Sequence, residues 1–425
     1  MSCHQSLQVT FKGDVEIFII KMHLAFGILQ LTLIPIEKKL IKYIIKSINV
    51  KKNSRPVMIF FKICEVNMKL LKTIKITFSM IFGILFSSCN YVDEMEAIKS
   101  ISELTEGVYY FEFFGDYDFE RFLAEGGNKT NEEMADFLTE SLSKGKWNKG
   151  DVEEKSVTIK TPDFGCSSIV AKNKDGKAIF GRNYDWKDCA IMVIHTKPKN
   201  GYESVSTSCL EFLGMDRNWK PQNKFPNDML ALASVYVPLD GMNEKGLYIA
   251  DLVCGDNETT AQNTGKTSLT ITSAIRLVLD KAATVDEAVS LLENHDIYSV
   301  IDTAHHFIIA DVTGKSVVVE WTGNKMYVSE SKILTNHYVA ESPKKGVFTY
   351  ENSKVRFEML EKYGNENKWT MNAEKMKECM KAVSVGSFDF EIQEITAWSA
   401  VYEPENKRIS YYFRENYEKP FIIEF

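Results

Sequence analysis

A cysteine, an arginine and an aspartate fall within one short segment of this 425-residue chain. Cys166 opens a run of β-forming residues, Lys174-Asp-Gly-Lys marks a tight turn, and the returning run carries Arg182 and Asp185. A hairpin of this kind brings a thiol, a guanidinium and a carboxylate near one another. A neighbouring cation lowers the pKa of a thiol and supplies the thiolate, the attacking species in nucleophilic catalysis. Cys166 is therefore a candidate nucleophile, although a buried cysteine also serves simply as a small apolar residue.

The elements that must position these residues are short strands interrupted by pairs of helices. Residues 268–283 and Val285–Glu293 have the spacing of amphipathic helices. Strands linked by hairpins, with helices inserted in pairs, indicate an α+β domain with a helix–sheet–sheet–helix layering. The expected strands are Cys166–Ala171, Ala178–Arg182, Ile191–Thr196, Gly246–Val253, His306–Asp311, Val317–Trp321, Ile333–Asn336, Ala397–Tyr402 and Ile409–Phe413.

A separate, acidic module precedes this domain, and its pattern is mostly helical. Val92–Leu104 has apolar residues at helical spacing, and Asn131–Leu142 begins with a capping residue and acids in its first turn. Gly107–Phe114 is aromatic enough for a buried strand or a packed turn. The module extends to Gly165 and ends where the β-rich pattern begins.

The segment from Met68 to Ser88 has the composition of an export signal. Three lysines precede an apolar run, Ile76–Phe86, which is too short for a stable transmembrane helix and is followed by two serines and Cys89. A cysteine in that position resembles a bacterial lipoprotein signal, in which it carries the lipid and heads the mature chain. We expect a lipid-anchored protein of a Gram-negative envelope, in the periplasm or outer membrane. Plain secretion and an uncleaved anchor are the alternatives.

Residues 1–67 differ in composition from everything that follows. They are basic and rich in Ile, Lys and Phe, with little periodicity, which favours an unstructured upstream extension; a basic membrane-surface segment is the alternative. The whole chain has a net charge of −7, which argues against nucleic acid as the main partner. Its 44% hydrophobic content excludes a disordered protein, and eight cysteines are too few for a disulfide-dense framework of this length.

Five ordered blocks of sequence resemble one family of enzymes. They are Cys166-Ser-Ser-Ile-Val, Gly181-Arg-Asn-Tyr-Asp-Trp, Asp240-Gly-Met-Asn-Glu-Lys-Gly-Leu, Asp311-Val-Thr-Gly-Lys-Ser-Val-Val-Val-Glu and Leu334-Thr-Asn-His. The blocks resemble the choloylglycine hydrolase family of linear amide C–N hydrolases, which includes bile salt hydrolases, penicillin V acylases and acid-ceramidase-like amidases. The resemblance implies an N-terminal-nucleophile fold, a four-layer αββα sandwich, for a catalytic domain spanning residues 166–425. We expect neither a cofactor nor a metal.

The resemblance also implies a role for individual residues. Cys166 matches the family nucleophile, whose own α-amine is the general base once the cysteine heads a chain. Arg182 and Asp185 match the residues that position the thiol and the amine. Asn336 matches the asparagine that donates to the oxyanion, a contribution worth about 10²–10³ in rate.

Two positions depart from the family pattern. Bile salt hydrolases carry a second asparagine where the ungapped equivalent in this chain is Val253, so a backbone N–H or another residue must supply that donor. The late arginine of the family matches Arg356 by residue type, whereas strict spacing favours Lys354. We take Arg356 as the catalytic candidate.

The position of Cys166 within the chain implies processing. Its α-amine becomes free only if the Gly165–Cys166 bond is cut, because residues 89–165 lie between the expected lipid-bearing cysteine and the nucleophile. This arrangement resembles the acid-ceramidase and N-acylethanolamine amidase branch, in which a precursor cuts itself. We expect residues 89–165 to remain bound afterwards as a helical cover.

Substrate class and assembly are left open by these residues. The expected substrate is an amide with an apolar acyl group, such as a conjugated bile salt or an N-acylethanolamine-type lipid. Penicillin V acylase activity, acyl transfer to an amine, and a non-catalytic lipid-binding surface lipoprotein are the alternatives. Relatives with this fold form dimers or tetramers, so a homo-oligomer is also open.

Several further side chains have a functional and a purely structural interpretation. His305 and His306 point to opposite faces of a strand, which argues against a shared metal. His337 either touches substrate or packs, and Trp398 belongs to the core or a pocket wall. Leu210–Leu230 is either an apolar lid for an acyl chain or an ordinary packed loop. The remaining cysteines of the domain are interpreted as free or buried thiols: Cys189, Cys209, Cys254 and Cys379.

Overall fold

A computed structural model describes residues 92–143, 165–222, 228–254, 258–347, 351–388 and 394–425. The expected upstream extension, the export signal and Cys89 lie outside these residues. Among the described helices, none has the length and apolar character needed to cross a membrane.

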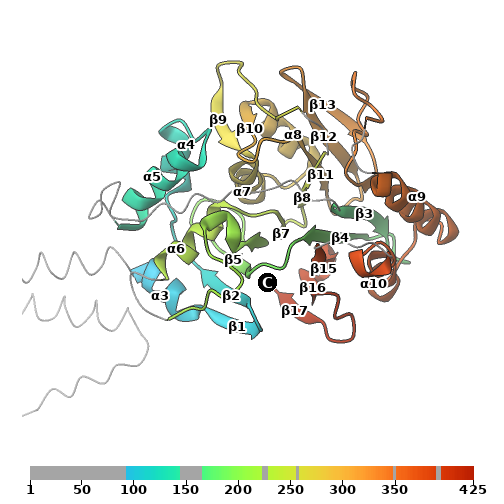
Figure 1. The fold of residues 1–425 in the computed structure, drawn as a ribbon, viewed down its shortest axis with the longest axis horizontal. Coiled ribbons are helices and arrows are strands. Elements are labelled where there is room, and N and C mark those ends of the chain that lie inside the picture. The colour runs from blue at the N-terminus through green and yellow to red at the C-terminus, as the bar shows by residue number, and fades with distance from the viewer. Residues whose placement is uncertain (1–91, 144–164, 223–227, 255–257, 348–350, 389–393) are drawn as a thin grey trace, which may run out of the picture. The chain divides into compact units, whose positions relative to one another are not determined.

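Two large sheets and a short parallel pair, β9 with β10, form the fold (Figure 1). The nine-stranded sheet has the order β1-β2-β5-β6-β7-β8-β11-β12-β13, and the six-stranded sheet has the order β14-β3-β4-β15-β16-β17. The strands are β1 Ser102–Thr105, β2 Val108–Phe113, β3 Ser167–Lys172, β4 Ala178–Trp186, β5 Ile191–Thr196, β6 Ser204–Cys209, β7 Asp240–Asn243, β8 Tyr248–Val253, β9 Thr267–Thr270, β10 His295–Tyr298, β11 His305–Ala310, β12 Ser316–Thr322, β13 Lys325–Glu330, β14 Ile333–Leu334, β15 Ile395–Glu403, β16 Arg408–Phe413 and β17 Phe421–Glu424. The α-helices are α3 Val92–Ser100, α4 Phe119–Ala124, α5 Asn131–Ser143, α6 Met229–Leu232, α7 Ile271–Lys281, α8 Val285–Glu293, α9 Glu351–Glu366 and α10 Ala373–Ala382.

Most inner strands of the nine-stranded sheet are buried on both faces, as their alternating side chains show. On β11, Phe307 and Ile309 join an apolar cluster that contains α7 and α8, whereas Ile308 and Ala310 join a second cluster shared with the other sheet. Adjacent side chains in a strand point to opposite faces, so an inner strand such as β11 contributes to two cores. One face of this sheet therefore packs on helices and the other packs on the six-stranded sheet.

The six-stranded sheet repeats this arrangement with its own pair of helices. On β3, Val170 faces the core between the sheets, while Ile169 and Ala171 pack with Met376 and Met380 of α10. Figure 1 shows α9 and α10 together beside β3 and β4. The layers are thus helix, sheet, sheet, helix, and the αββα sandwich expected from the sequence is confirmed.

The module before Cys166 is mostly helical, as expected, and it also extends the nine-stranded sheet. The single helix expected over Val92–Leu104 ends at Ser100, and Ser102–Thr105 forms β1 instead. Thr105 pairs with Val108, so the two residues between them form the hairpin loop, and Gly107 adopts a positive φ of 67°. β2 then pairs in parallel with β5. Residues 92–143 therefore form part of the nine-stranded sheet as well as a helical cover.

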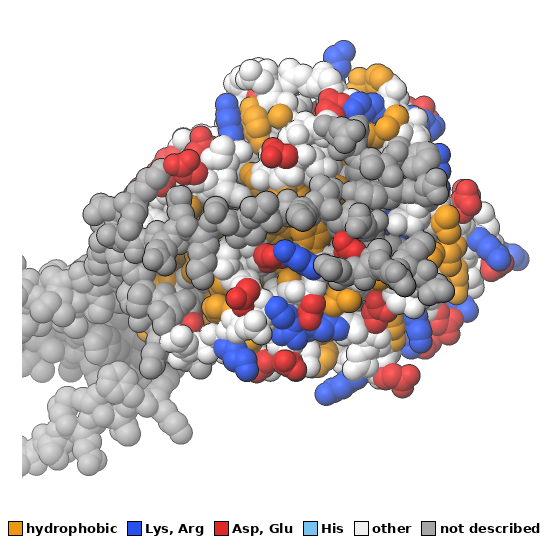
Figure 2. Space-filling view, in the orientation of Figure 1, with side chains coloured by type: hydrophobic (Ala, Val, Ile, Leu, Met, Phe, Trp, Pro, Cys, Tyr) orange, Lys and Arg blue, Asp and Glu red, His pale blue; other side chains and the backbone are white. Residues whose placement is uncertain are grey.

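For most elements of the catalytic domain, the bounds predicted from the sequence pattern are close to those in the structure. β5 and α8 have the predicted bounds, and the turn at Asp311–Lys315 joins β11 to β12 as expected. β4 runs further than expected, to Trp186, so that Asp185 belongs to the strand. On the face shown in Figure 2, acidic and basic side chains of the described residues are interspersed.

Candidate active site

The register of β3 and β14 places Asn336 near Cys166. Ile333 pairs with Ile169 and Leu334 with Ser168 in antiparallel register. Continuing this register toward the start of β3 brings Asn336 opposite Cys166, although the two residues are far apart in sequence. Both side chains line the same cavity and both are buried.

Arg182 faces the same side of the six-stranded sheet as Cys166. It pairs with Ser168 across β3 and β4, which puts its side chain on the face that also carries the thiol. Its Nε lies 3.3 Å from Oδ2 of Asp240, and its Nη2 donates to the backbone oxygen of Asp251 at 2.7 Å. Asp240 also accepts from Trp398 Nε1 at 2.9 Å, so this buried carboxylate fixes the guanidinium in place.

Asp185 sits at an irregular point of the strand pairing. β15 pairs with β4 through Thr396 and Trp398, and a bulge between these two residues shifts the register beside Asp185. Bulges commonly re-aim side chains next to active sites. Here Thr396 Oγ1 donates to Asp185 Oδ1 at 2.6 Å. Oδ2 of Asp185 is buried without a hydrogen-bond partner among the described residues.

Arg356 connects the start of β3 to Asn336 from helix α9. Its Nη1 donates to the backbone oxygen of Cys166 at 2.5 Å and to Ser167 Oγ at 2.8 Å. Its Nη2 donates to Asn336 Oδ1 at 2.9 Å and to Asn352 Oδ1 at 3.0 Å. A planar guanidinium can hold several acceptors at fixed angles, which a lysine ammonium cannot do in the same way. The residue favoured by type in the sequence is thus the one that reaches the site.

Gly165 packs directly against the side chain of Asn336. A Cβ at position 165 would lie 2.3 Å from Asn336 Cγ and 2.5 Å from its Nδ2, closer than real Cβ contacts allow. Asn336 Nδ2 donates to the backbone oxygen of Val253 at 2.6 Å. Val253 therefore contributes its carbonyl to the site, where the sequence suggested only a missing side-chain donor.

Burial dominates the electrostatics of these groups. It raises the pKa of the Cys166 thiol, and the Arg182 guanidinium offsets part of this rise. It also raises the pKa of Asp185 to about 7, against the opposing effect of Arg356. Burial lowers the pKa of Arg356 to about 10, so that this side chain remains a cation at neutral pH. The thiol is therefore protonated at neutral pH. Asp185, with a pKa of about 7, is partly ionised at neutral pH and can both accept and release a proton.

A cavity opens beside Cys166. Its floor at the nucleophile is formed by Gly165, Cys166, Asp185 and Asn336. The lining side chains beyond this floor are mainly apolar or aromatic, with a few polar ones: Asn131, Tyr184, Trp186, Phe212, Val237, Leu239, Asp251, Val253, Ile271, Thr272, Val300, Ile301 and His305. An apolar cavity with few polar groups suits an organic ligand with a largely apolar body.

Of the other side chains considered in the sequence, some line the cavity and others do not. His337 Nδ1 lies 2.9 Å from Ser353 Oγ. The pKa of His337 is lowered to about 4, first by burial and then by the proximity of His306. It does not line the cavity. In the loop after β6, Phe212 lines the cavity, whereas Trp219 packs edge-on against Tyr109 of the preceding module. The five described cysteines are buried and free of disulfides.

One set of potential metal ligands occurs among the described residues. Ligand atoms of Cys254, His306 and Glu320 lie within 4.8 Å of one another, all fully buried. The Glu320 carboxylate already accepts the backbone N–H groups of Val339 and Ala340, at 2.7 and 3.1 Å. His306 Nδ1 lies 3.4 Å from the same carboxylate. These contacts anchor the segment that follows Asn336, which is sufficient to explain why the carboxylate is buried.

Sequence reasoning missed three parts of this site. Asp240 was noted only within a motif, although it holds Arg182, and Thr396 was not noted at all. The pairing of His305 with Asp251 on the cavity wall was also missed. A buried aspartate in a strand is a signal for the first, but the partners of the other two depend on pairing between distant strands.

The chain is similar in sequence to several known proteins. Residues 231–418 match the family profile described as acyl-coenzyme A:6-aminopenicillanic acid acyl-transferase. A bile salt hydrolase/transferase of Clostridium perfringens is 29% identical over 188 residues, which cover 40% of this chain and 53% of that protein. A penicillin V acylase of Pectobacterium atrosepticum is 31% identical over 110 residues, covering 23% of this chain and 29% of the relative. These similarities support the resemblance of the chain to the choloylglycine hydrolase family of N-terminal-nucleophile hydrolases.

The similarity to these relatives is distant and covers only part of each of them. The match spans about half the length of the bile salt hydrolase/transferase and less of the penicillin V acylase. Among solved structures, a conjugated bile acid hydrolase variant from Clostridium perfringens is 19% identical with a TM-score of 0.44, covering 61% of this chain and 92% of its own. Penicillin V acylase from Agrobacterium tumefaciens is also 19% identical, with a TM-score of 0.43 and coverage of 60% and 84%.

Proposed function

We propose that this protein is an exported precursor that cuts itself at Gly165–Cys166 and then hydrolyses linear amide bonds through a thioester on Cys166. The observation that carries the proposal is the contact of Gly165 with Asn336. The peptide bond to be cut and the residue matching the oxyanion donor meet in the uncut chain. The same groups that would process a substrate thus already surround this bond.

Self-cleavage needs a base other than the α-amine, because that nitrogen is still part of the peptide bond. Asp185 is suited to this task because its pKa is about 7 and its Oδ2 has no partner among the described residues. Sγ of Cys166 attacks the carbonyl carbon of Gly165 as its proton passes to the base. The C–N bond then breaks, the α-nitrogen leaves with a proton, and water hydrolyses the resulting thioester to give the Gly165 carboxylate and free Cys166.

Amide hydrolysis repeats this chemistry on a bound substrate. The freed α-amine now accepts the thiol proton, and Sγ attacks the substrate carbonyl. Asn336 stabilises the oxygen that becomes negative, while Arg356 and the Val253 carbonyl orient the Asn336 amide. The substrate amine leaves with a proton, and water then releases the acid from the thioester. Asp185, no longer needed as the base, pairs with the new ammonium group.

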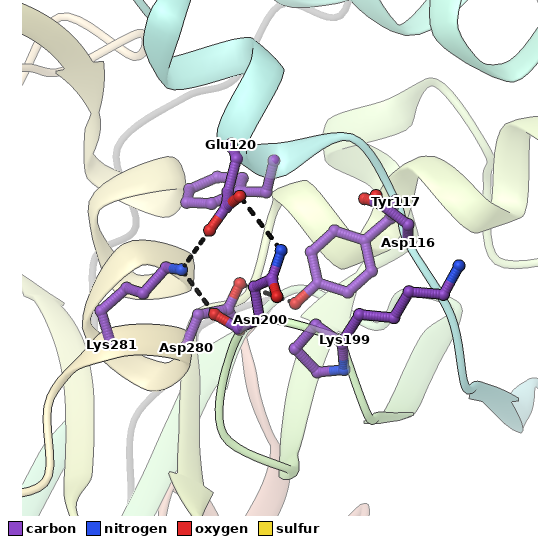
Figure 3. A pocket seen from close by; sticks show the side chains of 9 residues that line it. Asp116, Tyr117, Glu120, Lys199, Asn200, Asp280 and Lys281 are labelled. Carbon is purple, nitrogen blue, oxygen red and sulfur yellow. Dashed lines mark hydrogen bonds and ion pairs between the residues drawn. The ribbon is translucent and has the colours of Figure 1, made fainter.

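The short chain stays attached after the cut, in our proposal, because it is built into the fold. β2 continues the sheet beside β5, and side chains tie the two parts together at a second place (Figure 3). There, Tyr117 OH donates to Asp280 Oδ2 at 2.7 Å, and Lys281 Nζ lies 2.7 Å from Glu120 Oε1. Asn131 also lines the cavity, so the short chain contributes to the substrate site.

The substrate is an N-acyl amide with an apolar acyl group, such as a conjugated bile salt or an N-acylethanolamine-type lipid. Support comes from the apolar walls of the cavity and from the activities for which the two relatives are named. A panel of glycocholate, taurocholate, an N-acylethanolamine and penicillin V would rank these classes. Adding an acceptor amine would show acyl transfer, the activity named for the matching family profile, as a new amide product.

Export and lipid anchoring at Cys89 complete the proposal and rest on the sequence alone. Mass spectrometry of protein from an export-competent host would report lipid on Cys89 and scission before Cys166 in one measurement. A Cys166→Ala variant should remain a single chain. An uncut wild-type chain with full amidase activity would overturn the self-cleavage proposal. Failure of an electrophilic amide analogue to label Cys166 would instead favour a lipid-binding lipoprotein.

A further inference from the structure

His305 forms a buried pair with an aspartate on the neighbouring strand. Its Nδ1 lies 3.0 Å from both carboxylate oxygens of Asp251. β8 and β11 are antiparallel, and His305 lies opposite Val253. Asp251 is two residues before Val253 on β8, so its side chain lies on the same face of the sheet as that of His305. Only 4% of His305 and 6% of Asp251 are exposed. A carboxylate can only accept, so Nδ1 carries the proton and the ring orientation is fixed.

The second ring nitrogen of His305 is left without a partner. Nε2 is buried and has no hydrogen bond among the described residues, and His305 lines the cavity that contains Cys166. A buried polar atom without a partner is costly, and such atoms in native structures call for an explanation. Neither the self-cleavage nor the hydrolysis described above uses this nitrogen. A polar group on a bound ligand would satisfy it.

The surroundings restrict what that ligand group can be. The cavity wall around the pair is largely apolar and includes Phe212, Ile271 and Ile301. Nε2 accepts a hydrogen bond when the imidazole is neutral and donates one when it is charged. A hydroxyl group both donates and accepts, so it satisfies Nε2 in either state, whereas a carboxylate fits only the charged ring. Asp251 places a further negative charge beside the site, which opposes an anionic ligand group.

We propose that His305, held by Asp251, binds a hydroxyl group on the apolar acyl part of the substrate. This inference rests on the proposed amidase function and narrows its substrate class to hydroxylated acyl amides. The pair is also connected to the nucleophile, because Arg182 donates to the backbone oxygen of Asp251. A substrate that lacks the hydroxyl leaves Nε2 unpaired and loses transition-state binding.

The test compares para-nitroanilides of octanoic acid and of its monohydroxylated isomers, with the half-anilide of octanedioic acid as the anionic analogue. For the wild-type protein, we expect at least one hydroxy isomer to exceed the octanoyl anilide in kcat/KM by tenfold or more. His305→Phe keeps the ring and removes both nitrogens, and this advantage should fall below twofold. His305→Gln keeps a polar end that can bond a hydroxyl and should retain part of it.

Controls separate recognition of the hydroxyl from damage to the site. Val300→Ala alters the apolar wall of the same cavity and should change all anilides together, leaving their ratio intact. Scission before Cys166 and the melting temperature report whether each variant folds. If His305→Phe does not fold, Asp251→Asn replaces it, and the loss of the fixed ring orientation should also reduce the preference.

Three results would overturn the hydroxyl anchor: no isomer is preferred, the preference survives in His305→Phe, or the half-anilide of the diacid is the best substrate. Failure of the proposed function gives a different result, because the wild type then hydrolyses none of the anilides. In that case calorimetry of the same anilides with Cys166→Ala decides the inference. Tighter binding of a hydroxy isomer that is lost in the double variant with His305→Phe supports the anchor, and equal binding overturns it.

Discussion

Replacing Gly165 with alanine should slow self-cleavage by displacing Asn336. The added Cβ would lie 2.3 Å from both Cγ and Oδ1 of Asn336, so one of the two residues must move. Asn336 is held on both sides, with its Oδ1 2.9 Å from Arg356 Nη2 and its Nδ2 2.6 Å from the Val253 carbonyl. Losing one oxyanion donor costs about 10²–10³ in rate, or roughly 2.7–4 kcal/mol. We expect scission of Gly165→Ala to be slower than that of the wild type by about this factor.

A pulse-chase experiment with gel separation of the two fragments measures this rate directly. A double-variant cycle then tests whether the effect passes through Asn336. Asn336→Ala removes the obstructing side chain together with the donor, so the double variant Gly165→Ala, Asn336→Ala should cut no more slowly than Asn336→Ala alone. Each cut molecule of Gly165→Ala should retain wild-type amidase activity, because residue 165 then ends the short chain. A wild-type scission rate in Gly165→Ala, or fully additive slowing in the double variant, would refute the reasoning.

Three further predictions address the groups around this bond. Scission should accelerate as pH rises and level off above about 7, because burial raises the pKa of Asp185 to about 7 and only its ionised form accepts the thiol proton. Scission of Asp185→Asn should be slow at every pH, and a wild-type pH profile in that variant would contradict the assignment of Asp185 as the base. Arg356→Lys replaces a fork that holds four acceptors and should slow scission at least tenfold in the same pulse-chase assay, whereas a change below twofold would exclude this positioning role. Tyr117→Phe removes a buried hydrogen bond to Asp280 and should weaken retention of the short chain by about 1 kcal/mol. The short chain should then be released at a lower urea concentration. Release at the wild-type concentration would show that strand pairing alone holds the short chain.

Local patterns predicted the parts of the site that lie on one hairpin. Cys166 and Arg182 follow from a strand, a turn and a returning strand, and the structure has this hairpin with Arg182 opposite Ser168. The alternation of a strand likewise predicted that His305 and His306 face opposite ways. Their contacts confirm this, because one reaches Asp251 and the other Glu320.

Contacts between distant strands were not predictable in the same way. The position of Asn336 beside Cys166 depends on the register of β14 against β3, and the family resemblance named the residue without giving this geometry. Alternation within one strand restricts its register but does not identify which distant strand it pairs with, because every strand offers the same backbone groups. The pairing of His305 with Asp251 depends on β8 against β11 for the same reason. Strand β1 was missed because Glu106-Gly107, which forms its hairpin loop, is a weaker turn signal than Asn-Gly.

The parallel pairing of β2 with β5 has a consequence for the life of the protein after the proposed cut. While the chain is continuous, β2 returns to its partner in a first-order reaction whose rate does not depend on protein concentration. Once the bond before Cys166 is broken, the same pairing must form between two molecules and becomes concentration-dependent. A processed molecule that unfolds at low protein concentration would then rarely reassemble, so its useful lifetime would be set by its rate of unfolding.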